Sequence, residues 1–236
     1  MNSSKVYTRV NRVSGQLCEQ ARDVSVSDIH EAMGALSRTG LMSPRMRPLN
    51  RGLRIAGPAI TAFCASGDNL MMHRALYFAQ AGDVLVVVCP AEASGAQWGD
   101  VAAQYALHKK LAGVIVQGCI RDTDVLEQLR FPVWSTLISP ARPDKRGHGL
   151  VNAPVSCDGA IVTPGDLVVA DGDGVVVVPR EDSAAVIGAA RLRMEKENEI
   201  ASAIRSGAHP WEFTGSAAVY ATMGIDECDA CWDGSK

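Results

Sequence analysis

Strand-like and helix-like hydrophobic patterns alternate through the middle of the chain. Residues 83–89 (DVLVVVC) and 113–117 (GVIVQ) are nearly continuous β-branched runs, which predict strands covered on both faces. A third strand is predicted at 133–138. Helical patterns between and around these strands cover 69–78, 99–111 and 122–129. This order predicts a layered α/β fold.

The first part of the chain carries shorter signals. Residues 1–25 are predicted to form an amphipathic helix with its lead-in, and a second helix opens at Ser27. Ser27 can cap that helix, and Asp28 with Glu31 suits its positive end. Residues 40–48 are predicted to be a loop. Residues 54–64 are predicted to form a strand, in which Pro58 indicates an edge position or a bulge.

The last third of the chain has a different pattern. Short strands are predicted at 160–162, 167–170 and 174–178, separated by tight turns at 163–166 and 171–174. This spacing predicts a β-meander. A long charged helix over about 182–206 should follow and end at Gly207. Residues 208–236 are expected to be an irregular tail, and residues 1–236 are predicted to form a single α/β domain.

Composition narrows the class of protein. The 236 residues can bury a substantial core, and a net charge of −3 without a basic block argues against a nucleic-acid partner. No apolar run reaches the roughly 18 residues that cross a bilayer, and the first residues lack the apolar segment of a signal peptide. Several of the seven cysteines lie in predicted strands, which favours free thiols. We therefore expect a cytoplasmic protein without a membrane partner.

The stretch from Gly113 to Asp122 carries the most chemistry. A buried strand runs through a glycine turn and delivers Arg121 and Asp122 at the start of a short helix. Ligands in open α/β sheets bind outside the carboxyl ends of the strands, so these side chains are placed to meet a ligand. The alternative is an ion pair that only caps the helix.

A second acidic residue follows the neighbouring strand. After residues 83–89, a loop of small residues leads to Gly99 and Asp100 at a predicted helix start. The backbone amides of Gly99, Asp100, Val101 and Ala102 would be free to bind a carboxylate. Asp100 could instead serve only as the helix cap.

Together these residues indicate metal-assisted enolate chemistry. Asp100 and Asp122 are hard oxygen ligands that suit Mg²⁺ or Mn²⁺. Arg121 offers a planar fork to a carboxylate or to an enolate oxygen. Metal, guanidinium and amides could stabilise a pyruvate enolate. No lysine lies in a predicted buried strand, so a Schiff-base aldolase is disfavoured.

A family resemblance rests on these positions and on several further motifs. Asp100 is followed after twenty residues by Arg121-Asp122, and the chain also contains IHEAMG (29–34), MRP (46–48), GDNLMMH (67–73), GD (82–83), FPVWS (131–135), VTPGD (162–166) and VADGDGVVVVP (169–179). This pattern, over about residues 25–207, resembles the class II pyruvate aldolases of the 4-hydroxy-4-methyl-2-oxoglutarate / 4-carboxy-4-hydroxy-2-oxoadipate type. Their superfamily includes the regulator of ribonuclease activity A.

The resemblance implies a role for each matching residue. Asp122 would bind the metal directly, Asp100 would act through metal-bound water, and Arg121 would contact the keto oxygen and stabilise the enolate. Amides of Gly99, Asp100, Val101 and Ala102 would hold the pyruvyl carboxylate. A glutamate from the last helix of an adjacent subunit would complete the water shell. Glu197 fits that position and Glu199 is the alternative, although a solvated helix face explains these glutamates, with Glu195, equally.

The resemblance also implies an architecture and an activity. The fold would be an α/β/α sandwich with a central mixed sheet, assembled as a homotrimer or homohexamer with active sites between subunits. The enzyme would be a lyase that cleaves a 4-hydroxy-2-oxo acid to pyruvate in aromatic compound catabolism, with oxaloacetate decarboxylase as a side activity. The alternatives are a non-catalytic regulator that binds an RNA-degrading enzyme, or a different lyase or hydrolase that reuses the enolate site.

Four other features have simpler explanations that we weigh against a functional one. His30 and His73 near helix starts could be bases but fit structural roles better. The turn at 171–174 (DGDG) lacks the rest of a calcium loop, and Cys228-x-x-Cys231 lacks a second half-site for zinc. The basic residues of the 140–148 loop (Arg142, Lys145, Arg146 and His148) fit a solvated surface, or could recognise a second substrate carboxylate.

Overall fold

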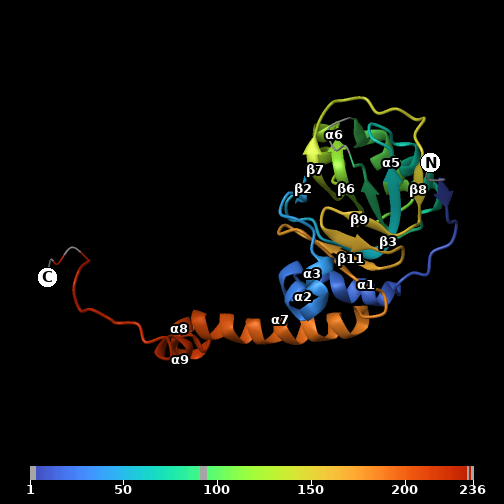
Figure 1. Cartoon of the computed structure of the whole chain (residues 1–236). Coiled ribbons are helices and arrows are strands. Elements are labelled where there is room, and N and C mark those ends of the chain that lie inside the picture. Colours follow the sequence, from blue (N-terminus) through green and yellow to red (C-terminus); the bar gives the residue numbers. More distant parts are fainter. Residues whose placement is uncertain (1–3, 91–94, 233, 235–236) are drawn as a thin grey trace. The chain divides into compact units, whose positions relative to one another are not determined.

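The computed structural model of the chain describes residues 4–90, 95–232 and 234. These residues fall into two compact units that divide between Arg191 and Leu192. The first unit holds the sheet and all of the predicted strands. Figure 1 traces the chain through its helices and strands.

A mixed sheet forms the centre of the first unit. Its main path runs β1 (Lys5–Val6), β8 (Gly149–Val151), β3 (Ile55–Cys64), β4 (Val84–Val88), β6 (Gly113–Ile120), β7 (Val133–Ile138) and β2 (Arg47–Pro48). The ladders β3–β4, β4–β6 and β6–β7 are parallel. The carboxyl ends of these strands therefore share one edge of the sheet. Short β5 (Ala96–Trp98) adds to the end of β6.

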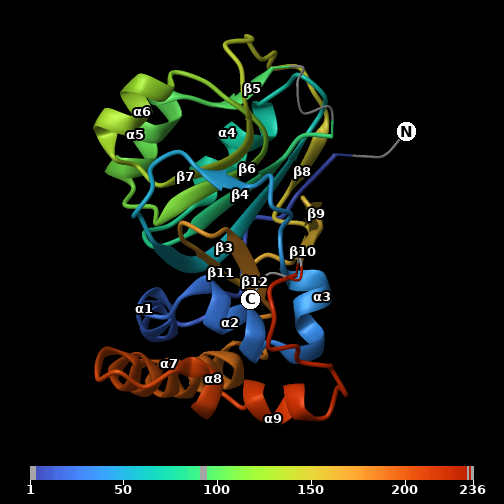
Figure 2. The ribbon, with the colours of Figure 1, turned by 90° about the vertical axis from the view of Figure 1, so that its left-hand side faces the viewer.

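Helices cover one face of this sheet. The helices α4 (Leu70–Phe78), α5 (Asp100–His108) and α6 (Thr123–Leu129) pack on it, as the upper part of Figure 2 shows. Buried residues from these helices and from β3, β4 and β6 form one apolar cluster. The strands are buried on both faces, which explains their continuous apolar runs.

Two hairpins cover the opposite face. β9 (Val155–Cys157) pairs with β10 (Ala160–Val162), and β11 (Leu167–Ala170) pairs with both β12 (Val175–Val178) and β3. Helices α1 (Gly15–Arg22) and α2 (Val26–Ala32) pack against β11 and β12 together with the start of α7. A short 3-10 helix (Gly34–Leu36) and α3 (Ser37–Gly40) follow.

The predicted layered α/β fold with a mixed sheet is therefore confirmed. All three short strands of the last third are present, as β10, β11 and β12. They pair as parts of two hairpins, with β10 on β9 and β11 on β12, rather than strictly one after another. The predicted turn at Asp171–Gly174 joins β11 to β12, and the amide of Asp171 donates to the carbonyl of Gly174 at 3.1 Å.

One local prediction holds and another was wrong. Pro58 lies at an edge position within β3, because at this residue the described ladders pair β3 with β11 alone. The amide of Ala59 donates to Asp166 beside β11. Residue 58 faces the other side, where the β4 ladder begins only at Ala59, so the missing amide of Pro58 breaks no ladder bond. Helix α2 is capped by Ser25 rather than Ser27, since the Ser25 hydroxyl accepts from the amide of Asp28 at 3.0 Å.

The second unit contains the end of the long helix and the tail. Helix α7 (Ser183–Arg205) matches the prediction, and the chain leaves it through Gly207 at a φ of 95°. The tail is not irregular throughout, because it forms α8 (Pro210–Phe213) and α9 (Ser216–Ala221). Pro210 starts α8, and the rings of Trp211 and Tyr220 meet edge to face at 5.1 Å. Cys228 and Cys231 are exposed.

Among the residues that the structure describes, none of the helices has the length and apolarity to cross a membrane. The assignment of residues 1–236 to a single domain stays a prediction.

Candidate active site

The pairing of β5 with β6 brings the two predicted motifs together. Trp98 pairs in parallel with Ile120, and the amide of Arg121 donates to the carbonyl of Trp98 at 3.0 Å. The residues that follow each strand, Asp100 on one side and Asp122 on the other, therefore lie next to each other. A sequence separation of more than twenty residues becomes a local contact at the edge of the sheet.

Gly99 makes this close approach possible. A Cβ atom on Gly99 would lie 2.6 Å from Oδ2 of Asp122 and 3.2 Å from Cγ of Arg121. Real Cβ atoms do not approach other heavy atoms to 2.6 Å. The position must therefore be glycine if Arg121 and Asp122 are to keep their places at the start of α5.

Asp122 holds an unusual backbone conformation before α6. Its φ is 58° and its ψ is 37°, a left-handed conformation that asparagine and aspartate tolerate better than most residues. Its carbonyl accepts the amides of Val125 and Leu126. Its side chain does not cap α6. It turns toward α5 instead, where Oδ2 lies 3.2 Å from Nε of Arg121 and 3.5 Å from the amide of Asp100.

These charged groups remain accessible. The side chains of Arg121 and Asp122 keep 38% and 36% of their surface exposed. Among the described residues, the side-chain amide of Gln104 is the one group that donates to the carboxylate of Asp100, at 3.5 Å. Two carboxylates and a guanidinium are therefore placed beside the first turn of α5, where the amides of Val101 and Ala102 have no acceptor within the helix, with surface left for a ligand.

A cavity of about 490 Å³ opens in front of these groups. One wall is the start of α5, a second is the Arg121–Asp122 turn, and a third is the beginning of α4. The loop at 142–146 also lines the cavity. The lining residues include all six that the sequence predicted for the site in this unit: Gly99, Asp100, Val101, Ala102, Arg121 and Asp122.

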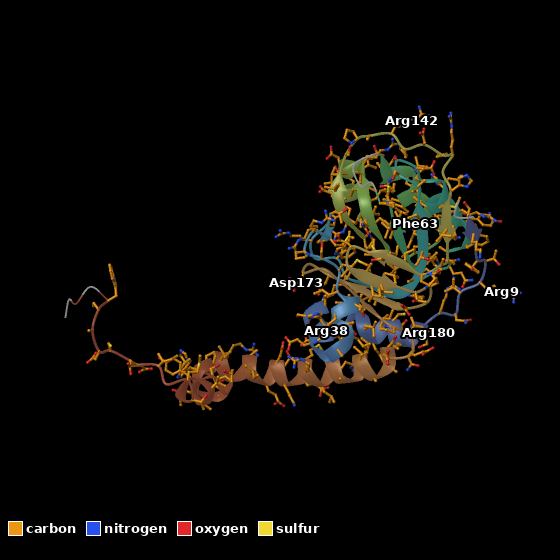
Figure 3. All side chains as sticks on the ribbon, in the orientation of Figure 1. Arg9, Arg38, Phe63, Arg142, Asp173 and Arg180 are labelled. Atoms are coloured by element: carbon orange, nitrogen blue, oxygen red, sulfur yellow. The ribbon has the colours of Figure 1, made fainter. Side chains whose placement is uncertain are left out.

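The basic loop is fixed to the cavity wall by Asp68. The buried carboxylate of Asp68 accepts the amides of Arg146 and Gly147 through Oδ2 and the amide of Leu70, at the start of α4, through Oδ1. The carbonyl of Asp144 also accepts the amide of Asn69 at 3.0 Å. Arg142, labelled in Figure 3, lies on the same loop. The loop thus brings Arg142, Lys145 and Arg146 to the cavity instead of extending freely into solvent.

Two buried polar atoms in the cavity wall lack hydrogen-bond partners within the described part of the chain. They are Oδ1 of Asn69 and Nε1 of Trp98. Trp98 is otherwise fixed, stacked on Phe131 with ring centroids 5.8 Å apart. An unpaired buried polar atom costs about 1–3 kcal/mol. Such atoms in a cavity beside charged groups support a polar ligand there.

His73 lines the cavity from α4. Burial and, to a smaller degree, the nearby charge of Lys145 lower the pKa of His73 from its ordinary value. The ring is therefore neutral at neutral pH. His30, the other histidine that the sequence offered as a possible base, lies in α2 and does not line this cavity.

The predicted glutamates belong to the other unit. Glu197 is exposed on α7, 3.6 Å from Arg193 one turn earlier, and Glu195 and Glu199 are exposed as well. Their part in the site stays a prediction. No group of three or more histidine, cysteine or acidic residues suited to a metal occurs within the described ranges. Of the carboxylates predicted to bind or serve a metal, the first unit contributes Asp100 and Asp122.

A larger cavity, of about 650 Å³, lies elsewhere in the first unit. Its lining includes Arg9, Asn152 and Arg180, and none of the residues predicted for catalysis. Arg9 and Arg180 are labelled in Figure 3. Size alone would favour this cavity, but the smaller one holds the converging charged groups.

The sequence did not indicate the roles of Asn69, Trp98 and Asp68 in this site. All three fall in or beside apolar or turn-like stretches, where burial gives no separate signal. The motif GDNLMMH (67–73) contains Asp68, Asn69 and His73, so its likeness to a family motif was the one available sign.

Comparison with known proteins decides the family. A family model described as RraA-like, Aldolase/RraA, matches residues 26–177, well over half of the chain. The chain belongs to the Aldolase/RraA family. The resemblance inferred from Asp100, Arg121 and Asp122 is thereby confirmed at the level of the family.

Relatives within the Aldolase/RraA family carry aldolase names. A protein of Halalkalibacterium halodurans named "Putative 4-hydroxy-4-methyl-2-oxoglutarate aldolase" is 35% identical over 174 residues, covering 74% of this chain and 81% of that protein. A Burkholderia mallei protein of the same name is 37% identical over 150 residues, covering 64% and 90%.

Solved structures share the fold. An uncharacterized protein from Pseudomonas syringae pv. tomato superposes with a TM-score of 0.76 at 26% identity, covering 84% of this chain and 96% of that one. Streptomyces coelicolor RraAS2, described as an unusual member of the RNase ES inhibitor RraA family, gives 0.71 at 30% identity, covering 82% and 99%.

Proposed function

We propose that this Aldolase/RraA protein is a divalent-metal-dependent aldolase. It cleaves a 4-hydroxy-2-oxo acid that bears a further carboxylate, and it releases pyruvate and a second oxo compound. The observation that carries the proposal is the single cavity in which Asp100, Arg121 and Asp122 meet the free amides of α5, opposite a fixed basic loop. The aldolase names of its relatives support the same reaction class.

Each part of the cavity suits one part of such a substrate. The amides of Val101 and Ala102 at the start of α5 bind the pyruvyl carboxylate. Arg121 donates to the 2-oxo oxygen and stabilises the negative charge that develops there when the C3–C4 bond breaks. Arg142, Lys145 and Arg146 on the opposite side bind the second carboxylate. The oxidation state of the substrate is unchanged, so no redox cofactor is needed.

The donor set fits a divalent cation. Mg²⁺ is commonly held by one or two carboxylates while it keeps several waters. Asp122, and Asp100 through water, would supply these oxygens, and Glu197 of an adjacent subunit, or Glu199, would extend the shell in a homotrimer or homohexamer. When bound, the ion would act as a Lewis acid toward the 2-oxo group. The same enolate chemistry implies oxaloacetate decarboxylation as a second activity.

The test is a coupled assay of pyruvate release. Purified protein is given 4-hydroxy-4-methyl-2-oxoglutarate, and separately oxaloacetate, with Mg²⁺ or Mn²⁺ and then with EDTA. Turnover should need the metal and should be lost in Asp122→Ala. Asp124→Ala provides a matched control, because Asp124 is an exposed carboxylate on α6 that does not line the cavity.

Two results would count against the proposal. Turnover that persists in EDTA would contradict the proposed metal dependence. Absence of turnover on every 4-hydroxy-2-oxo acid would contradict the proposed reaction. In the second case the likeness to RraAS2 favours a regulator that binds an RNA-degrading enzyme. Inhibition of such an enzyme by the purified chain, equal in wild type and Asp122→Ala, would support that alternative.

A further inference from the structure

The proposed cleavage needs a group that accepts a proton from the substrate. The C4 hydroxyl must lose its proton as the C3–C4 bond breaks. The family resemblance suggests for this task a metal-linked water or hydroxide served by Asp100 and the glutamate of α7. Asp100, however, lies at the start of α5, to which the pyruvyl carboxylate is assigned above, whereas the second carboxylate, and with it C4, is assigned to the basic loop.

The basic loop and α4 both line the cavity. His73 lines it from α4, close enough to Lys145 for that charge to act on its ring. In 4-hydroxy-4-methyl-2-oxoglutarate, C4 carries both the hydroxyl and the second carboxylate. A carboxylate bound by Lys145 therefore brings the hydroxyl on the same carbon toward His73.

The first turn of α4 fixes the backbone that carries His73. The amide of His73 donates to the carbonyl of Asn69 at 3.2 Å, so the two residues lie one turn apart on the same side of α4. Met72, Ala75 and Leu76 anchor the helix in the core. Within the ranges that the structure describes, no residue hydrogen-bonds or ion-pairs with the His73 ring.

We propose that His73 is the base that removes the proton from the C4 hydroxyl, a role that rests on the aldolase function proposed above. Oδ1 of Asn69, buried and unpaired beside it, is an acceptor that orients the same hydroxyl before transfer. His73 thus touches the reacting atoms, and Asn69 is a positioning residue.

The proton and the electrons balance within one substrate. The O–H bond at C4 breaks, its proton passes to a ring nitrogen of His73, and its electron pair forms the C4=O bond. The pair of the C3–C4 bond becomes the enolate, with its charge on the 2-oxo oxygen beside Arg121. The imidazolium then donates the proton to C3, which becomes the methyl group of pyruvate.

Oxaloacetate separates this role from a structural one. Its decarboxylation forms the same enolate but has no C4 hydroxyl to deprotonate. A neutral His73 brings no proton to that reaction, so C3 takes its proton from water. Loss of His73 should therefore affect aldol cleavage and leave decarboxylation largely intact.

The experiment compares His73→Gln with wild type on both substrates. Aldol cleavage should lose about 10²-fold or more in kcat, the usual contribution of a general base, while oxaloacetate decarboxylation changes less than about threefold. His108→Gln is the matched control, because His108 is an exposed histidine on α5 outside the cavity. Retained decarboxylation also shows that the variant folds.

The pH profile gives a second readout. The kcat/KM for aldol cleavage should fall at acid pH as His73 becomes protonated, and this limb should be absent in His73→Gln. Other charged groups also line the cavity, and their contributions to the pH profile have to be separated from that of His73. They are Asp100, Arg121, Asp122, Arg142, Asp144, Lys145 and Arg146.

Two outcomes would overturn the role of His73. Equal losses on both substrates would show that it only supports the site, and unchanged aldol cleavage would show that the proton goes elsewhere. Either result leaves the aldolase function standing if the wild type cleaves. Failure of the wild type to cleave any 4-hydroxy-2-oxo acid would instead overturn the function itself.

Discussion

At the scale of single residues, the missing side chain of Gly99 sets the geometry of the site. A Cβ atom there would lie 2.6 Å from Oδ2 of Asp122. Gly99→Ala should therefore push Asp122 and Arg121 outward while the fold stays intact. Because misplacement of a reacting group by about 1 Å can cost about 10²-fold in rate, we expect kcat/KM for pyruvate release to fall at least tenfold.

Gly188→Ala is the control for Gly99→Ala. A Cβ atom on Gly188, in α7, meets nothing within 4 Å. Alanine is favoured over glycine inside a helix by about 0.5–1 kcal/mol, so this change should raise the free energy of unfolding and leave kcat/KM unchanged. Full activity of Gly99→Ala would show that Asp122 can move without consequence.

The charge of Lys145 tunes His73 at the same scale. Burial lowers the pKa of His73 first, and Lys145 lowers it further. In Lys145→Met the charge is lost, so the His73 pKa rises and more of the ring is protonated at mildly acid pH. The acid limb of kcat/KM for aldol cleavage should move to higher pH, measured as a pH–rate profile. A limb that moves to lower pH, or stays in place, would contradict this coupling.

At the scale of elements, Asp68 joins helix α4 to the basic loop. Its carboxylate accepts amides from both, so Asp68→Ala leaves Arg146 and Gly147 without their acceptor. The released loop should raise KM for a substrate with two carboxylates by about tenfold, since binding must then order the loop. Pyruvate, which lacks the second carboxylate, should inhibit both proteins with similar constants. If Asp68→Ala weakened inhibition by pyruvate as much as it raised KM for the substrate, the effect would lie at α5 instead.

The same elements show what the sequence could predict. Buried strands such as β4 and β6 are continuous apolar runs, so their place in the sheet was predictable from local pattern. The pairing of Pro58 depends on strand β11, which is distant in sequence and which local pattern does not reveal. Ser25 and Ser27 are both suitable cap residues, and the choice of Ser25 depends on where the chain turns into α2.

The site divides in the same way. Asp100, Arg121 and Asp122 follow strand ends, and parallel strands bring such residues to one edge, so their meeting was predictable. His73 and Asn69 come from the start of a helix that packs on the sheet, and the loop with Lys145 folds back through Asp68. Those approaches depend on tertiary hydrogen bonds, so the third and fourth walls of the cavity could not be derived.

At the scale of the whole molecule, the second unit bears on assembly. None of its described residues is buried, and Trp211, Val219 and Met223 leave 43%, 63% and 64% of their surfaces exposed. Apolar surface of this kind is commonly covered by a partner. Light scattering should give three or six times the 25.0 kDa chain mass. A monomer at micromolar concentration would contradict the predicted assembly.

A mixing experiment tests whether subunits share the site. Asp122→Ala and Glu197→Gln should each be nearly inactive. Mixed after gentle dissociation, they should recover part of the activity, because some interfaces combine an intact Asp122 from one subunit with an intact Glu197 from its neighbour. Glu195→Gln should behave like wild type, and Glu199→Gln separates the two candidates. No recovery on mixing would place both carboxylates in one subunit.

The stability of the whole molecule should decline at alkaline pH. Burial raises the pKa of Cys18 to about 11 and that of Cys64 to about 12, from an ordinary value of 9.0. The unfolded chain therefore ionises first, and the stability is fully present below pH 9 and lost as the pH rises toward those values. Each thiol lowers the free energy of unfolding by at most about 1.4 kcal/mol per pH unit.

Urea unfolding between pH 8 and pH 11 measures this slope. The slope should be shallower in Cys64→Ala and unchanged in Cys228→Ala, whose thiol is exposed. A slope in Cys64→Ala as steep as in wild type would mean that other groups carry the effect.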